Sequence, residues 1–407
     1  MITTLLVVAL AGTAPPPVAA DTLHVPPPGA WETRAPEALG MDPDALEAAI
    51  SFALEAESTT PRDLAVAHLR GFGREPLGDA VGPFRERGDP SGIIVKNGYI
   101  VAEWGDPHRV DNTFSVTKSF LSAVVGLAHH RGLIPDIHEP VERLMAPVQV
   151  EDPRCVAPGP PTRDFDGPAD PFIPFAGDHA GAITWDHLLR QTSDWAGTLW
   201  CKPDWADRPA GDADTWGARD RHEPGTRYEY NDVRVNLLAL AALNVWRRPL
   251  PEVLREHLMD PIGASPTWRW TGYDTSWILL DGQWVQSVSG GAHWGGGMFI
   301  SARDMARFGL LHLRKGQWGD REVLPESWID KGLEPGEANP GYGFMNHFLN
   351  VDGRNLSSAT PGSHYHAGAG SNIVYVDPEH DLVVVVRWIR QQALDEFIGR
   401  VLASIPD

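Results

Sequence analysis

Residues 114–120 read Phe114-Ser115-Val116-Thr117-Lys118-Ser119-Phe120 and lead into an apolar stretch that ends at Arg131. Hydrophobic residues recur there at helical spacing: Phe120, Leu121, Val124, Val125 and Leu127. Gly132 follows, and glycine is common just past the end of a helix. The pattern predicts a helix that begins near Ser115, with Ser115 and Lys118 three residues apart on one face.

This pair has the parts of an acyl-transfer nucleophile. A serine hydroxyl can attack a carbonyl, a neutral lysine amine can take its proton, and the free N–H groups of a first helical turn can bind the oxyanion. The chain has only five lysines, so a lysine at the start of an apolar helix is informative. The alternative is structural: Ser115 caps the helix and Lys118 extends to solvent.

The N-terminal part of the chain predicts a helix and a hairpin. Asp42-Pro43 supplies an N-cap and a first-turn proline. The apolar residues of the helix that follows share one face: Leu46, Ile50 and Leu54. Residues 92–104 form two β-rich runs about Asn97-Gly98, the dipeptide most typical of a tight hairpin turn.

The C-terminal part repeats this arrangement. Residues 372–376 and 382–388 are β-branched runs joined by a short polar turn, and an amphipathic helix is expected over 392–404. Between about 135 and 290 the sequence is rich in Pro, Asp and Trp, with helical stretches at 184–190 and 233–246. Strand signals are scarce there.

We therefore expect an α+β fold in which N- and C-terminal helices flank an antiparallel β-sheet. Residues 21–134 and 291–407 would form the sheet domain, and residues 135–290 a mainly helical inserted lobe. A cleft between the two is the expected position of a functional site.

The composition narrows the possible partners. The chain has 407 residues with 34 Lys and Arg against 54 Asp and Glu, a net charge of −20. Such a surface repels phosphate backbones and anionic lipid, so we expect a small-molecule partner and no nucleic acid. No stretch has the length of a membrane span.

The first 20 residues resemble a secretory signal. An apolar run over 4–12 precedes Val18-Ala19-Ala20, but no basic residue occurs before Arg34. We expect a secreted or periplasmic protein, with a cytoplasmic one as the alternative. Cys155 and Cys201 can pair if the chain is exported, or remain two buried thiols.

No metal or cofactor is expected. His129-His130 end a helix without an H-E-x-x-H pattern, and three aspartates lie in a loop that lacks calcium-binding spacing: Asp164, Asp166 and Asp170.

The segment from Ser115 to Lys118 resembles the first motif of the serine β-lactamase and penicillin-binding protein superfamily, in its class C-like branch of esterases and 6-aminohexanoate-dimer hydrolases. Residues 225–232 resemble the second motif, a tyrosine followed two residues later by Asn. This resemblance implies that Tyr230 is the second catalytic group. Tyr228 is the other candidate for this role, but we expect it to be a packing aromatic. Asp232 stands where the family has Asn.

Three further segments resemble the family. Residues 191–195 resemble a stretch that usually ends in Thr-Ser-Gly, with Asp194 in place of the glycine and Trp195 after it. Residues 295–298 resemble the family's Gly-Gly turn. Residues 365–371 resemble the third motif, with His366-Ala367-Gly368 in place of Lys-Thr-Gly. The resemblance assigns the oxyanion amides to Ser115 and to Ala369, the residue after Gly368.

The departures shape the expected substrate. In β-lactamases the third-motif lysine and the second-motif Asn contact the drug, whereas this chain has His366 and Asp232. Efficient β-lactam turnover is therefore disfavoured. A carboxylic ester or linear amide fits better, including one with a cationic end that Asp232 or Asp194 could meet. Trp195 and Gly368 complete the expected substrate-binding residues.

The sequence thus predicts a cofactor-free serine hydrolase that forms an acyl-enzyme on Ser115, with Lys118 and Tyr230 moving the proton. The alternatives are a β-lactamase or D-Ala-D-Ala carboxypeptidase, and a catalytically silent sensor or binding protein with the same fold.

Overall fold

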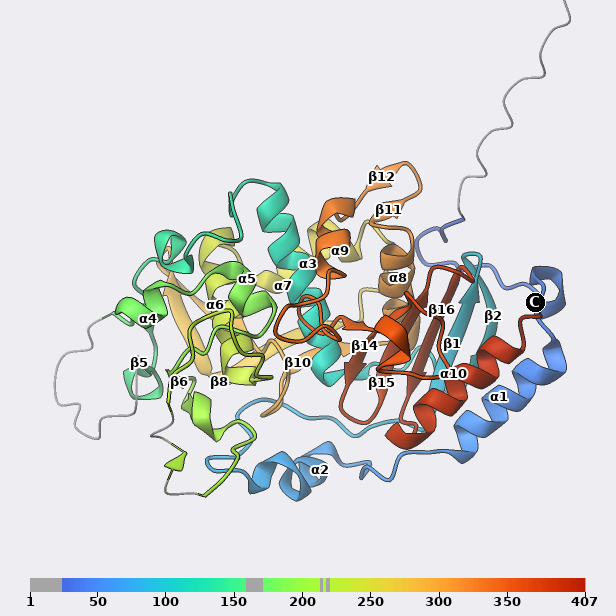
Figure 1. Ribbon diagram of the computed structural model, residues 1–407, viewed down its shortest axis with the longest axis horizontal. Coiled ribbons are helices and arrows are strands. Elements are labelled where there is room, and N and C mark those ends of the chain that lie inside the picture. The colour runs from blue at the N-terminus through green and yellow to red at the C-terminus, as the bar shows by residue number, and fades with distance from the viewer. Residues whose placement is uncertain (1–23, 159–170, 213–214, 217–219, 407) are drawn as a thin grey trace, which may run out of the picture.

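The computed structural model describes residues 24–158, 171–212, 215–216 and 220–406 (Figure 1). The expected signal segment, residues 1–20, and the loop aspartates Asp164, Asp166 and Asp170 lie outside the described residues. No helix in the described ranges is long and apolar enough to cross a membrane.

The larger sheet has six antiparallel strands in the order β13-β14-β15-β16-β1-β2. Their bounds are β13 Phe348–Leu349, β14 His364–Gly368, β15 Asn372–Asp377, β16 Leu382–Arg387, β1 Ser91–Lys96 and β2 Tyr99–Trp104. Both predicted strand pairs, β1-β2 and β15-β16, are present. Asn97 and Gly98 have φ values of 54° and 82° at the β1-β2 turn, the left-handed pair that a two-residue hairpin requires.

Helices cover both faces of this sheet. The side chains of β16 alternate: Val384 packs with α1 (Pro43–Glu55) and α10 (Leu394–Ala403), while Val383 and Val385 pack on the side of α8 (Ala302–Leu313). Figure 1 shows α1 and α10 side by side across the sheet. The predicted sheet with helices from both ends of the chain is confirmed.

The predicted apolar face of α1 is partly wrong. Leu46 is buried, but Leu54 is 45% exposed, and the helix packs through Ala49 and Ala53 instead. Small side chains let α1 approach the sheet closely, so the large residues at its edge remain in solvent.

A second sheet lies in the other half of the molecule. Its order is β3-β10-β8-β4, with β9 paired to β8. The bounds are β3 Asp111–Asn112, β4 Gln149–Val150, β8 Arg269–Leu280, β9 Gln283–Val288 and β10 Gly297–Ile300. The β8-β9 hairpin falls where strand signals are scarce, because polar residues interrupt the apolar alternation of β8. Its turn, Asp281-Gly282, is nevertheless a hairpin dipeptide.

Two buried helices join the halves of the molecule. The helix predicted after Ser115 is α3 (Thr117–His130), which follows a 3-10 turn over Phe114–Val116 and packs against α6 (Asp232–Trp246). The remaining helices are α2 Leu64–Arg70, α4 Asp178–Gly181, α5 Trp185–Leu189, α7 Leu250–Leu254, a π-helix at Arg255–Met259 and α9 Glu326–Gly332. The remaining strands are β5 Ala157–Pro158, β6 Gly197–Leu199, β7 Lys202–Pro203, β11 Gln317–Trp318 and β12 Arg321–Glu322.

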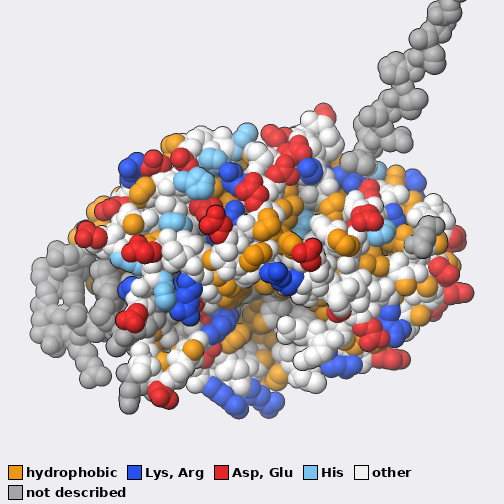
Figure 2. All heavy atoms as spheres, viewed as in Figure 1, with side chains coloured by type: hydrophobic (Ala, Val, Ile, Leu, Met, Phe, Trp, Pro, Cys, Tyr) orange, Lys and Arg blue, Asp and Glu red, His pale blue; other side chains and the backbone are white. Residues whose placement is uncertain are grey.

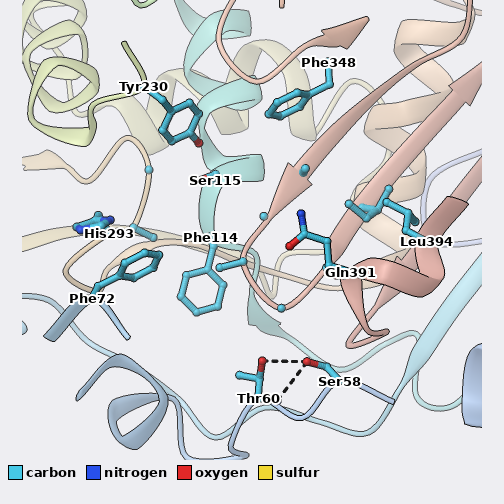
Figure 3. A pocket seen from close by; sticks show the side chains of 18 of the residues that line it. Ser58, Thr60, Phe72, Phe114, Ser115, Tyr230, His293, Phe348, Gln391 and Leu394 are labelled. Atoms are coloured by element: carbon cyan, nitrogen blue, oxygen red, sulfur yellow. Dashed lines mark hydrogen bonds between the residues drawn. The ribbon is translucent and has the colours of Figure 1, made fainter. Parts of the chain in front are cut away.

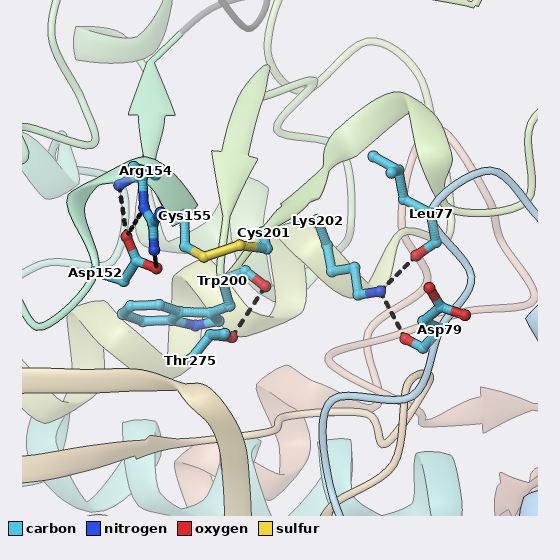
Figure 4. Close-up of a disulfide and its surroundings, with 9 residues drawn as sticks. All are labelled: Leu77, Asp79, Asp152, Arg154, Cys155, Trp200, Cys201, Lys202 and Thr275. Carbon is cyan, nitrogen blue, oxygen red and sulfur yellow. Dashed lines mark hydrogen bonds and ion pairs between the residues drawn. A yellow bond between two sulfur atoms is a disulfide. The ribbon is translucent and has the colours of Figure 1, made fainter. Parts of the chain in front are cut away.

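Cys155 and Cys201 form a disulfide beside the small sheet of β5, β6 and β7 (Figure 4). The next residue, Lys202, donates hydrogen bonds to the backbone carbonyls of Leu77 and Asp79, the latter at 2.7 Å. The inserted segment is therefore fastened both to itself and to the N-terminal part of the chain.

Candidate active site

Ser115 lies at a strained point of the backbone. It occupies the 3-10 turn before α3, and Phe114 next to it has a φ of 48°, which a bulky side chain rarely adopts. Strain of this kind is concentrated at functional sites. Lys118 Nζ lies 2.9 Å from Ser115 Oγ, so the pairing expected from the sequence spacing is present in the structure.

Lys118 is fully buried and has a second partner. Its Nζ lies 2.7 Å from Oδ1 of Asp232, which is only 1% exposed, and 4.6 Å from the centre of the Tyr230 ring. Gly291 lies directly against this pair. A Cβ at Gly291 would come within 1.7 Å of Asp232 Oδ1 and 2.1 Å of Lys118 Nζ, so only glycine fits there.

Burial and charge act on Lys118 in opposite directions. Burial lowers the pKa of its amine, Asp232 raises it and Arg208 lowers it, and the net pKa is below the usual lysine value. For Asp232, burial raises the pKa, but the positive charges of Lys118 and Arg208 outweigh burial and leave it below the usual range. Asp232 is therefore a carboxylate that opposes loss of the Lys118 proton.

Tyr230 lines the same pocket as Ser115. The following residue, Asn231, is the N-cap of α6, and its N–H donates to Gln191 Oε1 at 2.8 Å, which holds this turn in place. Burial raises the pKa of the Tyr230 phenol, and Asp232 acts in the same direction, whereas Arg208 and a hydrogen bond with Ser115 lower it. The phenol is neutral at rest. Tyr228 instead packs on Tyr342 beside a different pocket, as expected of a packing aromatic.

We call four charged residues the ionic cluster: Lys118, Asp232, Arg208 and Asp207. Sequence reasoning missed two of them, Arg208 and Asp207. Arg208 Nη1 lies 3.0 Å from Asp232 Oδ2 and also pairs with Asp207. Asp207 in turn accepts the backbone N–H of Asp232. No motif marks Asp207 and Arg208, because their role depends on long-range packing. The Gly290-Gly291 pair is visible in the sequence, but its contact with Lys118 is not.

The end of β14 lies against the turn that carries Ser115. A Cβ on Gly368 would come within 2.0 Å of Thr113 O and 3.3 Å of the Ser115 backbone nitrogen, so the strand approaches as closely as glycine permits. Ala369 follows and lines the same pocket as Ser115. The two backbone segments expected to supply oxyanion amides therefore meet at one cavity.

This cavity has a volume of about 380 Å³. Aromatic residues line it, among them Phe72, Phe114, Tyr230 and Phe348, which Figure 3 labels. Figure 2 shows the surface hollowed near the middle of the face, with hydrophobic side chains in the depression and basic side chains beside it. Among the described lining residues none is acidic, and Arg208 and His293 are the basic or imidazole side chains.

Three residues expected to bind substrate lie elsewhere. Asp194 is buried, with Oδ1 paired to Arg234 at 3.1 Å. Trp195 is fully buried and donates its indole N–H to Pro174 O at 2.6 Å. His366 is also fully buried and faces Ser119 and α8 rather than the pocket. These placements correct the sequence-based expectation: all three side chains are enclosed in the core, out of reach of a ligand on Ser115.

The expected salt bridge with a cationic substrate is also corrected. Asp232 lies beside the site, but both its oxygens already face cations within the protein, Lys118 and Arg208. Its charge therefore acts on Lys118 and Arg208 rather than on a ligand.

Comparison with known families agrees with this geometry. The β-lactamase family profile matches residues 91–399, which is most of the chain. The chain belongs to the β-lactamase family. The match begins at β1 and ends within α10, so it covers both sheets and the site around Ser115. No curated protein sequence matches significantly.

Solved structures show the same fold at low sequence identity. EstCE1, described as a hydrolase with promiscuous acyltransferase activity, aligns with a TM-score of 0.53 at 14% identity, covering 89% of this chain and 98% of that one. A family VIII carboxylesterase gives 0.50 at 15%, covering 84% and 95%. A Bacillus anthracis protein provisionally described as a 6-aminohexanoate-dimer hydrolase gives 0.51 at 15%, covering 78% and 80%.

Proposed function

We propose that this protein is a serine hydrolase that cleaves a carboxylic ester or a linear amide through an acyl-enzyme on Ser115. The observation that carries the proposal is the buried Lys118 amine, 2.9 Å from Ser115 Oγ at an aromatic cavity. Membership of the β-lactamase family, together with similarity to esterases and hydrolases of the same fold, supports a hydrolase in general.

The arrangement accounts for each proton. Ser115 Oγ bonds to the substrate carbonyl carbon while its proton passes to neutral Lys118, and the amides of Ser115 and Ala369 receive the developing oxyanion. The bond to the leaving oxygen or nitrogen then breaks as the neutral Tyr230 phenol gives up its proton to that atom. Lys118 reprotonates Tyr230. Water attacks the acyl-enzyme with the same groups in reverse and releases the acid.

The cavity favours a neutral acyl group. Aromatic rings and the apolar side chains of Ile373 and Leu394 supply apolar contact surface, and none of the described lining residues is a carboxylate that could bind a cation. We therefore propose an uncharged aliphatic or aromatic acyl group rather than the cationic one that the sequence suggests.

One observation favours the second candidate, a penicillin-recognising enzyme. Arg208 lines the pocket with a side chain that is 34% exposed, and an arginine can bind the carboxylate of a β-lactam or a D-Ala terminus. Against this, Asp207 and Asp232 already pair with its guanidinium.

The test compares three substrates on purified wild type and Ser115→Ala: a p-nitrophenyl butyrate ester, a linear 6-aminohexanoate dimer and a chromogenic cephalosporin. Turnover of the ester or the dimer by wild type alone supports the proposal. Preferential turnover of the cephalosporin favours the second candidate. If both proteins are folded and equally inactive with all three, the hydrolase proposal fails and a binding protein takes its place.

We also propose that the chain is exported, as its N-terminal sequence suggests. The disulfide between Cys155 and Cys201 supports this, because disulfides persist in oxidising compartments. Fractionation of cells that express the full chain should recover it outside the cytoplasm, cleaved near residue 20. Recovery of the uncleaved chain from the cytoplasm contradicts this proposal.

A further inference from the structure

Four buried histidines gather behind the active site, on the α8 side of the larger sheet. We call them the histidine cluster: His312, His347, His364 and His366. His312 lies on α8, His347 in the loop before β13, and His364 and His366 two residues apart on β14. None is more than 4% exposed.

Three of these imidazoles are held in a defined orientation. Nδ1 of His312 lies 3.0 Å from Phe308 O, and Nδ1 of His347 lies 2.7 Å from Phe344 O. A carbonyl can only accept, so both rings carry their proton on Nδ1 and present a bare lone pair at Nε2. Nδ1 of His366 lies 3.0 Å from Ser119 Oγ, which can accept a hydrogen bond in the same way.

Three of the four rings lie close together. One nitrogen from each of His312, His347 and His366 lies within 4.8 Å of the other two. Nε2 of His366 is buried without a hydrogen-bond partner among the described residues. The hydrogen bonds of His312 and His347 to backbone carbonyls use Nδ1 in both rings. Buried polar atoms are rarely left unpaired, so the partnerless Nε2 of His366, beside two further imidazoles, points to a missing ligand shared by the three rings.

The ring positions match those of a metal centre. With zinc–nitrogen bonds of about 2.0–2.1 Å and a tetrahedral angle, the ring centres of three zinc-bound imidazoles lie about 5 Å apart. The observed separations are 5.4 Å for His312 and His347, 5.0 Å for His312 and His366, and 4.6 Å for His347 and His366. The planes are inclined by 47° to 81°, so no two of the three rings stack.

We propose that His312, His347 and His366 bind one zinc ion through Nε2. Neutral imidazole is a preferred zinc ligand, and zinc-bound histidines usually donate their other N–H to a backbone carbonyl or similar acceptor, as these do.

Two further polar groups with unpaired atoms lie beside these three rings in the described structure. Asn346 precedes His347, and its Oδ1 is buried without a partner in the described part of the chain. Both ring nitrogens of His364 are also buried without a hydrogen-bond partner among the described residues. The ring centre of His364 lies 5.6 Å from that of His366. His364 is outside the group of three residues whose nitrogens lie within 4.8 Å of one another, so Asn346 Oδ1 or a water would be the fourth donor of a tetrahedral zinc.

A metal ion at this site would hold β14 in place next to Ser115. His366 is two residues before Gly368, whose backbone lies against the Ser115 turn. Nδ1 of His366 contacts Ser119, the residue after Lys118. An ion shared with α8 and the loop of His347 would fix β14 from behind. This is a structural metal, separate from the proposed hydrolysis at Ser115.

The competing explanation is an internal water. A water molecule has only two hydrogens, so it can satisfy two of the three lone pairs, whereas a metal ion satisfies all three. The two explanations predict different metal contents.

The test uses the full chain, expressed with a tag that contains no histidines in zinc-supplemented medium and purified without chelator. We expect about one zinc per chain by elemental analysis, and a zinc-edge X-ray absorption spectrum with about three imidazole nitrogens. Cobalt(II) introduced during refolding should give the visible bands of a tetrahedral site. Wild type that carries only a trace of zinc overturns the proposal in favour of an internal water.

Substitutions locate the ion. His347→Gln and His312→Gln should each lose the stoichiometric zinc, while His68→Gln, a change of a buried histidine bonded to Gly78 O, should keep it. Zinc retained by folded His347→Gln and His312→Gln overturns the assignment. If either variant fails to fold, the wild-type absorption spectrum decides alone. Ser115→Ala should keep its zinc, so failure of the hydrolase proposal and failure of the zinc proposal are distinguishable.

Discussion

Two buried polar clusters lie on either side of the first turn of α3, and adjacent residues lead into them. Lys118 belongs to the ionic cluster, where each charge has an opposite charge within hydrogen-bond distance. Ser119 leads into the histidine cluster, where ring nitrogens stay unpaired among the described residues. The charges of the ionic cluster are therefore paired within the protein, whereas the histidine cluster has ring nitrogens without a hydrogen-bond partner in the described structure. This difference underlies the two proposals, Lys118 as the proton acceptor of the hydrolysis and a zinc ion bound by the histidine cluster.

The largest expected effect is on the ionic side. Lys118→Ala removes the only amine near Ser115 Oγ in the described structure, and we expect kcat/KM for a p-nitrophenyl ester to fall by about 10²–10⁴. The zinc content should not change, because Lys118 does not touch the histidine cluster. Activity within a few-fold of wild type would show that Lys118 is not the base.

Gly291→Ala should break the same cluster without removing any of its charges. The new Cβ would overlap Asp232 and Lys118, so the pair must separate, and we expect kcat/KM to fall by about 10² or more. The matched control is Gly332→Ala at the end of α9, where the nearest atom to a Cβ is 3.6 Å away; its stability should change by less than about 0.5 kcal/mol. Equal activity of the two variants would contradict the account of Gly291.

Ser119→Ala acts on the histidine side alone. It removes the hydroxyl that contacts His366 Nδ1, and loss of such a partner typically weakens metal binding by about 10–100-fold. Competition with a chelator, followed by elemental analysis, measures this change, while ester hydrolysis should remain close to wild type. Ser122→Ala, one turn further along α3 and also buried, is the control. A large loss of hydrolysis with unchanged zinc affinity would reverse the assignment of the two clusters.

Asp232→Asn should change the pH dependence of kcat/KM more than the maximum value of kcat/KM. The Asp232 charge raises the pKa of Lys118, so its loss lowers that pKa and increases the neutral fraction at any given pH. The acid limb of kcat/KM should therefore move to lower pH, provided that neutral Lys118 accepts the proton. Asp260→Asn, at an exposed position, should leave the limb where it is. A shift to higher pH would contradict Lys118 as the titrating base.

The parts of this arrangement that are local in sequence could be predicted. Ser115 and Lys118 share a helical turn, and Asn97-Gly98 and the β-branched runs define the hairpins. Tyr230 came from resemblance to a family motif. Burial was harder to foresee: Asp194, Trp195 and His366 sit in matching motifs, yet their side chains are enclosed in the core.

The long-range contacts could not be predicted. Arg208 reaches Asp232 across 24 positions, and His312 meets His366 across 54, with no spacing rule to connect them. The spacing of Leu54 with Leu46 and Ile50 predicts a shared apolar face, whereas α1 packs through the smaller Ala49 and Ala53. The dipeptide Asp281-Gly282 indicates the turn of the β8-β9 hairpin, but the polar residues of β8 interrupt the alternation that would predict a strand.

The central claim is that Ser115 becomes acylated, and intact-mass analysis tests it most directly. Wild type mixed rapidly with p-nitrophenyl butyrate and quenched in acid should gain one butyryl group, mapped to the peptide with Ser115, alongside a burst of p-nitrophenol. Ser115→Ala should show neither. An adduct on another residue, or steady turnover with the same adduct in Ser115→Ala, would contradict the account.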